Sequence, residues 1–150
     1  MIRIDSGDMF KSGAEALVNP VNTVGVMGGG LALVFKNKYP KAFNAYKWAC
    51  DNGYLQPGTV MSWPIDNNQI VIHFPTKLHY RNPSLMEYVE TGLDDLILEI
   101  RHLNIKSIAI PALGCGLGGL DWADVEPLIR EKLAVLNDVD IILYPPKEAF

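Results

Sequence analysis

Short apolar runs alternate along the chain with longer segments in which apolar residues recur every three or four positions. The short runs predict β-strands at residues 2–4, 16–18, 58–63, 69–74, 107–110 and 140–144. The polar residues 66–68 predict a turn that joins the third and fourth strands as a pair. The last two runs are almost continuously apolar, which is typical of strands covered on both faces of a sheet.

Four segments show the spacing of an amphipathic helix. Pro40 separates the first two, because proline cannot continue a helix, and Ser84 and Asp121 are the expected N-caps of the third and fourth. Strands that alternate with helices predict an α/β fold, in which helices cover both faces of a mixed or parallel sheet. Ligands in such folds bind at the carboxyl ends of the strands. The apolar stripes of the four helices are Leu31, Val34 and Phe35; Phe43, Tyr46 and Cys50; Leu85, Val89, Leu93, Leu96, Ile100 and Leu103; and Val125, Leu128, Ile129, Leu133 and Leu136.

Length and composition favour a single well-packed domain, because the chain has 150 residues, of which 49% are hydrophobic and 20% charged. The net charge of −4 argues against a broad cationic surface that holds nucleic acid by neutralising many phosphates. Cys50 and Cys115 are too few for a disulfide framework. The first residues contain no apolar signal segment, and no apolar run reaches the ~20 residues that span a membrane. We therefore expect a cytoplasmic protein without membrane contact.

Two glycine-rich segments, residues 19–31 and 111–122, each follow a predicted strand and precede a predicted helix. Glycines let a backbone approach a ligand closely, and the N–H groups of a helix N-terminus favour an anion. The first segment is not a P-loop, because Leu31 and Ala32 stand where Lys and Ser or Thr are needed. The second satisfies G-x-G-x-x-G, the pattern of dinucleotide-binding loops. An NAD site of that kind also needs an acidic residue at the end of the following strand to bind the ribose hydroxyls, and none is present here. We interpret it as a diphosphate cradle rather than an NAD site.

Three further residues have side chains suited to chemistry. Asp8 follows the first strand, where a carboxylate can form a turn or accept a hydrogen bond from an adenine amino group. Lys77 follows a buried strand, and such a lysine can be a solvated charge, an anion contact or a desolvated nucleophile. Cys115 has no evident histidine partner, so a packed thiol is the better interpretation. The histidines have no zinc-ligand spacing with the cysteines, so we expect no metal and no other cofactor.

In this order, the motifs resemble those of the macro domains, the ADP-ribose-binding modules. The resemblance covers essentially the whole chain. It is carried by Gly7-Asp8-Met9, by Asn19-Pro20-Val21-Asn22 with the glycines that follow, and by residues 111–116. Finer features resemble the DarG-type antitoxins, which are similar to the terminal ADP-ribose glycohydrolases. Those features are residues 22–33, Phe74-Pro75-Thr76-Lys77 and residues 114–122.

The resemblance implies that residues 1–150 form a three-layer α/β/α macro domain with a mixed, mostly parallel sheet, as the N-terminal part of a longer protein. It implies that Asp8 and the Met9 amide bind adenine, that Tyr144 packs on the adenine, and that Asn22 points at the distal ribose. Lys77 and Asn22 are the implied catalytic residues. The implied ADP-ribose-binding residues are Asp8, Met9, Asn19, Asn22, Val26, Met27, Gly28, Gly29, Gly30, Leu31, Thr76, Pro111, Leu113, Gly114, Cys115, Gly116, Leu117, Gly118, Gly119 and Tyr144.

The resemblance also implies a DNA ADP-ribosyl glycohydrolase, which removes ADP-ribose from ADP-ribosylated thymine in single-stranded DNA and so reverses a DarT-type toxin. Lys77 would either attack the anomeric carbon through a Schiff base, or stay charged and orient the ribose while water attacks. Related glycohydrolases have an assisting aspartate where this chain has Gly118. Two alternatives therefore stay open: a non-catalytic ADP-ribose-binding module, and a hydrolase of ADP-ribosylated protein carboxylates or O-acetyl-ADP-ribose. ADP-ribose and the modified DNA are the expected partners, and a cognate DarT toxin is a further candidate.

Overall fold

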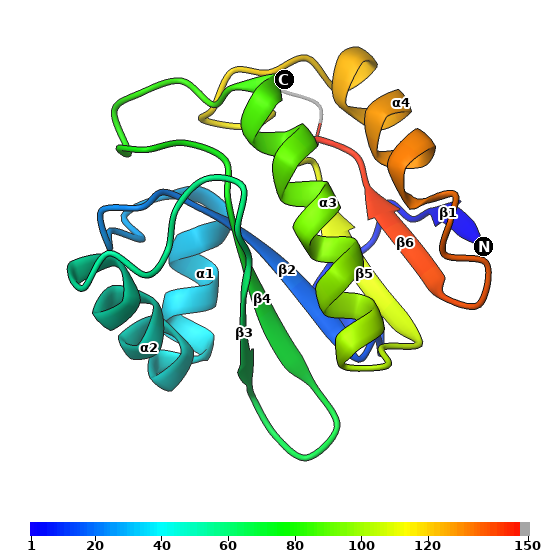
Figure 1. The fold of residues 1–150 in the computed structure, drawn as a ribbon, viewed down its shortest axis with the longest axis horizontal. Helices are drawn as coiled ribbons and strands as arrows, with labels where there is room; N and C mark the ends of the chain where they lie inside the picture. The colour runs from blue at the N-terminus through cyan, green and yellow to red at the C-terminus, as the bar shows by residue number, and fades with distance from the viewer. Residues whose placement is uncertain (148–150) are drawn as a thin grey trace.

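The computed structural model describes residues 1–147, which form one sheet with helices on both of its faces (Figure 1). Within these residues, six strands lie in the order β1-β6-β5-β2-β4-β3. Neighbouring strands are parallel, except that β3 runs antiparallel to β4 at one edge. The strands are β1 (Ile2–Ile4), β2 (Ala16–Val21), β3 (Met61–Pro64), β4 (Ile70–Pro75), β5 (Ser107–Pro111) and β6 (Asp140–Tyr144). The helices are the short 3-10 helix η1 (Met9–Lys11), α1 (Gly30–Lys38), α2 (Pro40–Asp51), α3 (Met86–His102) and α4 (Trp122–Leu133).

Successive residues of each strand pack on opposite faces of the sheet, which produces a separate apolar cluster on each face. Ala16 and Ile72 pack with side chains of α3 and α4. Their neighbours Leu17 and Val71 pack on the other face, with Phe35 of α1. The arrangement confirms the predicted three-layer α/β/α fold and its mixed, mostly parallel sheet.

The observed elements match the predicted ones and differ mainly at their ends. β2 continues to Val21, because residues 19–21 extend the parallel pairing with β4. β3 begins only at Met61, since residues 56–59 form a turn in which Gly58 has a φ of +92°. Asp121 caps α4 as predicted, accepting a hydrogen bond from the Ala123 amide.

The prediction that Ser84 caps α3 is wrong. Leu85 occupies the N-cap position, and no side chain forms a capping hydrogen bond there. Ser84 is buried instead, and its hydroxyl donates to Thr76 Oγ1 at 3.2 Å. A contact with the loop after β4 has therefore replaced the local cap that the sequence suggested.

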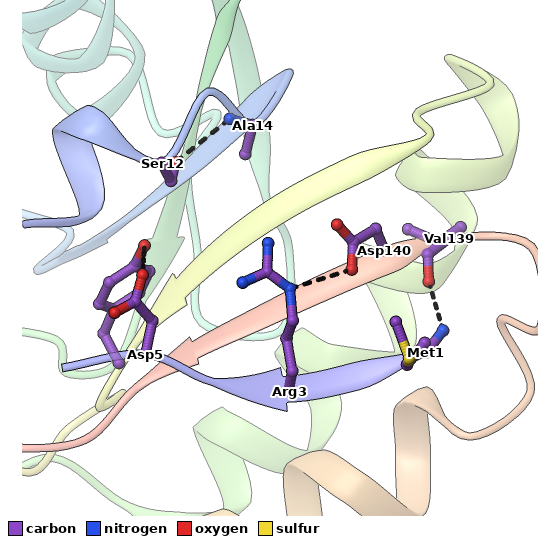
Figure 2. A network of polar contacts seen from close by, with 8 residues as sticks. Met1, Arg3, Asp5, Ser12, Ala14, Val139 and Asp140 are labelled. Atoms are coloured by element: carbon purple, nitrogen blue, oxygen red, sulfur yellow. Dashed lines mark hydrogen bonds and ion pairs between the residues drawn. The ribbon is translucent and has the colours of Figure 1, made fainter. Parts of the chain in front are cut away.

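The outer strand β1 is held to β6 by polar contacts as well as by pairing (Figure 2). The Met1 ammonium group donates to the Val139 carbonyl oxygen at 2.8 Å, and Arg3 Nε lies 3.5 Å from an oxygen of Asp140. Because β1 is parallel to β6, the residues that follow it emerge at the same edge of the sheet as those that follow β2, β4, β5 and β6. No helix within residues 1–147 has the length and apolarity needed to cross a membrane.

Candidate functional site

The loops after β1, β2, β4, β5 and β6 surround one cleft of about 1380 Å³. It lies at the carboxyl ends of the parallel strands, as expected for a sheet of this kind. Both glycine-rich segments line it, together with Asp8, Lys77 and Tyr144. The fold therefore brings together motifs that are far apart in the sequence.

Asn22 fixes the shape of the first glycine loop. Its Nδ2 donates to the Val26 carbonyl at 2.7 Å, and its Oδ1 accepts hydrogen bonds from the Val24 amide at 3.1 Å and from the Tyr46 hydroxyl at 2.8 Å. Burial raises the pKa of Tyr46, so that phenol keeps the proton it donates. Asn22 lines the cleft, but its side chain is engaged with the loop, so its main effect here is to position the loop backbone for a ligand.

Gly118 and Ser84 pack tightly against each other in the wall of the cleft. The Ser84 amide donates to the Gly118 carbonyl at 3.0 Å. A β-carbon on Gly118 would overlap the Ser84 hydroxyl and would lie only 2.5 Å from the Gly114 carbonyl oxygen. The space that a side chain at position 118 would need is already occupied, which explains why no carboxylate is found there.

Lys77 stands at the mouth of the cleft, directly after β4. Its Nζ donates to the Tyr80 carbonyl oxygen at 3.1 Å, and the residue is partly buried. Thr76, one residue earlier, is buried. The structure thus places the lysine in the cleft lining, with its ammonium group hydrogen-bonded to the Tyr80 carbonyl.

The loop after β1 forms the other end of the cleft. Asp8 Oδ1 accepts a hydrogen bond from the Phe10 amide and so caps η1, and Met9 is buried behind it. Tyr144 also lines this end, and its hydroxyl donates to Asp5 Oδ2 at 3.3 Å. Hydrogen bonds, chiefly from the Gly7 amide, lower the pKa of Asp5. Figure 2 shows Asp5 just beyond the end of β1.

Cys115 is a packed thiol, as the sequence favoured. It lines the cleft, but burial, with a smaller effect from Asp121, raises its pKa to about 11. A thiol with that pKa is almost entirely protonated near neutral pH and is a poor nucleophile. Among residues 1–147, no three His, Cys, Asp or Glu side chains come together as metal ligands.

Four of the expected ligand-binding residues do not line the cleft: Asn19, Met27, Leu113 and Gly119. The first three are buried in the interior. Asn19 Nδ2 lies 3.3 Å from His73 Nδ1, across the β2–β4 pairing and away from the cleft. A motif defined along the chain includes such residues, because some side chains of its strand and loop positions pack into the interior instead of lining the cleft.

Several lining residues were not predicted as ligand-binding. Ser84 was taken for a helix cap, and Tyr80 lies in a segment chosen only for its lysine. The remaining ones include three charged side chains, those of Asp5, Lys38 and Lys147. Others lie inside the motifs described above but were not named as binding residues. The unpredicted lining residues are Asp5, Ser6, Gly7, Phe10, Pro20, Val21, Ala32, Val34, Lys38, Tyr80, Ser84, Ala112, Pro145, Pro146 and Lys147.

The model of the macro domain family matches residues 18–129, a range that contains both glycine loops and Lys77. This chain is a macro domain. A protein named DNA ADP-ribosyl glycohydrolase from Mycobacterium tuberculosis is 50% identical to it over 149 residues, which are 97% of this chain and 42% of that protein. A protein of the same name from Thermus aquaticus is 46% identical, over 99% of this chain and 42% of that protein. This macro domain therefore spans about two fifths of the length of these relatives.

Solved structures agree with this assignment. The macrodomain of Mycobacterium tuberculosis DarG matches with a TM-score of 0.96 and 48% identity, and the match covers 98% of this chain and 99% of that one. Thermosipho africanus DarTG in complex with ADP-ribose matches with a TM-score of 0.92 and 35% identity, over 99% of this chain and 42% of that one. The predicted resemblance to DarG-type macro domains is confirmed.

Proposed function

We propose that this macro domain binds ADP-ribose in its cleft and hydrolyses the bond between ADP-ribose and a thymine base of single-stranded DNA. The observation that carries the proposal is the convergence of two glycine loops, Asp8 and Lys77 on one cleft. The names of its relatives with 46% and 50% identity support the reaction. The ADP-ribose in the related DarTG structure supports the ligand.

The cleft suits ADP-ribose from one end to the other. A carboxylate has two acceptor oxygens, and the Phe10 amide uses only Oδ1 of Asp8. Oδ2 can then accept a hydrogen bond from the adenine amino group, beside the ring of Tyr144. The second glycine loop offers backbone amides to the diphosphate, and the Asn22-braced first loop surrounds the distal ribose.

At the distal ribose, a water oxygen bonds to the anomeric carbon and the bond from that carbon to the thymine nitrogen breaks. The electron pair leaves with the base, and the proton released by water goes to the base or to solvent. The hydrogen bond that holds Lys77 to the Tyr80 carbonyl supports a role in orienting the ribose and stabilising the departing charge. Attack by the Lys77 amine is the alternative, and borohydride treatment during turnover would trap its Schiff base as a covalent adduct.

The test is release of ADP-ribose from single-stranded DNA that carries ADP-ribosylated thymine. We expect release by the wild-type chain, none above background for Lys77→Ala, and an unchanged rate for Lys41→Ala, an exposed lysine on α2 outside the cleft lining. If the wild-type chain at excess over the DNA releases nothing, the hydrolase proposal is wrong. Full activity of Lys77→Ala would instead remove the lysine from the mechanism.

A second candidate function is ADP-ribose binding without hydrolysis. Gly118 favours it, since Ser84 leaves no space for a carboxylate there. It predicts ADP-ribose binding in calorimetry, with no turnover of DNA, protein-carboxylate or O-acetyl conjugates assayed side by side. An interaction with a DarT-type toxin is a further proposal, supported by a 35% identical relative that is named as a transferase–glycohydrolase fusion protein.

A further inference from the structure

The rim of the cleft next to Lys77 carries a cluster of two rings and a cation, which the proposed reaction does not use. The rings of His79 and Tyr80 lie 4.2 Å apart between centroids, tilted by 31°. The guanidinium carbon of Arg81 lies 5.5 Å from the centre of the Tyr80 ring. Tyr80 is 43% exposed and lines the cleft. We call residues 79–81 the rim cluster.

The backbone of the rim cluster is well anchored. Thr23, from the first glycine loop, donates both its amide, at 3.0 Å, and its hydroxyl, at 2.9 Å, to the Leu78 carbonyl. The Arg81 amide donates to His79 Nδ1 at 3.1 Å, and Lys77 Nζ donates to the Tyr80 carbonyl. These bonds hold the backbone of the rim cluster and the His79 ring beside the lysine before any ligand arrives, which reduces the entropy lost when a ligand binds.

The charge around the rim cluster is unusual for this chain. The protein has seventeen acidic residues and a net charge of −4, yet residues 67–86 contain none of them. Lys77 and Arg81 are therefore the charged side chains of that segment, and a phosphate there meets no carboxylate from the same loop. An exposed aromatic ring beside an arginine is the combination that binds unpaired nucleotides, by base stacking and phosphate contact.

We propose that the rim cluster binds the unpaired nucleotide next to the ADP-ribosylated thymine, with its base stacked on Tyr80 and its phosphate on Arg81. The proposal rests on the proposed function and names the part of the DNA strand that the enzyme recognises. In this proposal the macro domain binds the DNA strand next to the modified base as well as ADP-ribose. A second exposed pair, Trp48 and Tyr54, is stacked at 5.3 Å but does not line the cleft. It therefore provides a control.

The experiment compares kcat/KM on two substrates, an ADP-ribosylated single-stranded oligonucleotide and ADP-ribosylated thymidine, a single nucleoside. Loss of a stacked base costs roughly 5- to 150-fold. We expect Tyr80→Ala to lower kcat/KM on the oligonucleotide by that factor more than on the nucleoside. Tyr80→Trp should keep the preference for the oligonucleotide, and Tyr54→Ala should leave it unchanged. Arg81→Gln should reduce the salt dependence on the oligonucleotide only.

Equal losses on both substrates for Tyr80→Ala, or no loss on either, would overturn the rim-cluster proposal while leaving the hydrolase intact. If the wild-type chain cleaves neither substrate, the proposed hydrolysis fails. The rim cluster is then tested by binding alone. The wild-type chain should bind the modified oligonucleotide more tightly than the modified nucleoside, and Tyr80→Ala should reduce that preference by the factor given above for a stacked base. Equal binding by the wild-type chain would refute the proposal.

Discussion

Gly118→Ala should destabilise the protein, although it adds only one methyl group. The new β-carbon would lie 2.5 Å from the Gly114 carbonyl oxygen and 2.8 Å from Ser84 Cβ, and it would overlap the Ser84 hydroxyl. Two of these neighbours are a backbone oxygen and a β-carbon, which cannot rotate away. The second glycine loop or the start of α3 must move instead.

The cost follows from the packing of the interior. Forcing an extra methyl group into a filled site typically costs about 1 to 3 kcal/mol. For a domain of about 150 residues this lowers the melting temperature by roughly 2 to 12 °C. Because the shift displaces the amides that we propose to bind the diphosphate, ADP-ribose affinity should fall as well.

The assay is thermal unfolding of Gly118→Ala beside Gly116→Ala, a matched control in the same loop. A β-carbon on Gly116 meets no atom within 4 Å, so that variant should unfold at the wild-type temperature. Ser84→Gly combined with Gly118→Ala should cost less than the sum of the two single changes, since two of the three close contacts disappear. Equal stability of Gly118→Ala and Gly116→Ala would refute the steric explanation for the missing carboxylate.

Burial lowers the pKa of His73 from 6.5 to about 4, so below pH 6.5 the unfolded chain binds a proton that the folded chain excludes. Denaturant titrations should therefore show the free energy of unfolding falling between pH 6.5 and 4, by about 3 kcal/mol from this group. His73→Gln should flatten that part of the pH profile, and an unchanged profile would contradict the lowered pKa of His73. Asn22→Ala should weaken ADP-ribose binding in calorimetry, because the first glycine loop loses its brace; unchanged affinity would refute that role. Iodoacetamide at neutral pH should alkylate Cys115 of the folded chain far more slowly than that of the unfolded chain, because its thiol pKa is about 11; equal rates would argue against a packed thiol.

The sequence predicted the elements well, because each depends on local patterns that the fold keeps. The apolar runs of β5 and β6 are covered on both faces, as continuous apolar strands must be. Pro40 separates α1 from α2, and Asp121 caps α4, since both act through their own backbone neighbourhood. Patterns of this kind do not need a partner from a distant part of the chain.

The parts that could not be predicted depend on contacts between distant segments. Ser84 precedes an apolar helix and so satisfies the local rule for a cap, but it lies against Thr76 and Gly118 instead. Asn19 belongs to a motif that resembles a ligand loop, yet it faces His73 in the interior. Neither outcome follows from residues nearby in the sequence, because each depends on which strand lies beside β2 and where the second glycine loop packs.

The absence of a carboxylate at position 118 agrees with the chemistry of the bond that the enzyme is proposed to cut. Among residues 1–147, the carboxylates that line the cleft are Asp5 and Asp8, both after β1. Lys77 follows β4, which lies four strand positions from β1 in the sheet. Both aspartates belong to the loop at the proposed adenine end of the cleft, so we expect neither to assist at the distal ribose.

Thymine compensates for that absence through its own chemistry. Its deoxyribose occupies one ring nitrogen, and the other lies between two carbonyl groups, so a negative charge left there is delocalised. Such a leaving group needs little help from a general acid. ADP-ribose linked to a serine hydroxyl would leave as an alkoxide and does need a proton. We therefore expect release from thymine conjugates and none from serine conjugates at equal enzyme concentration. Comparable rates on the two would mean that an acid acts at the distal ribose after all.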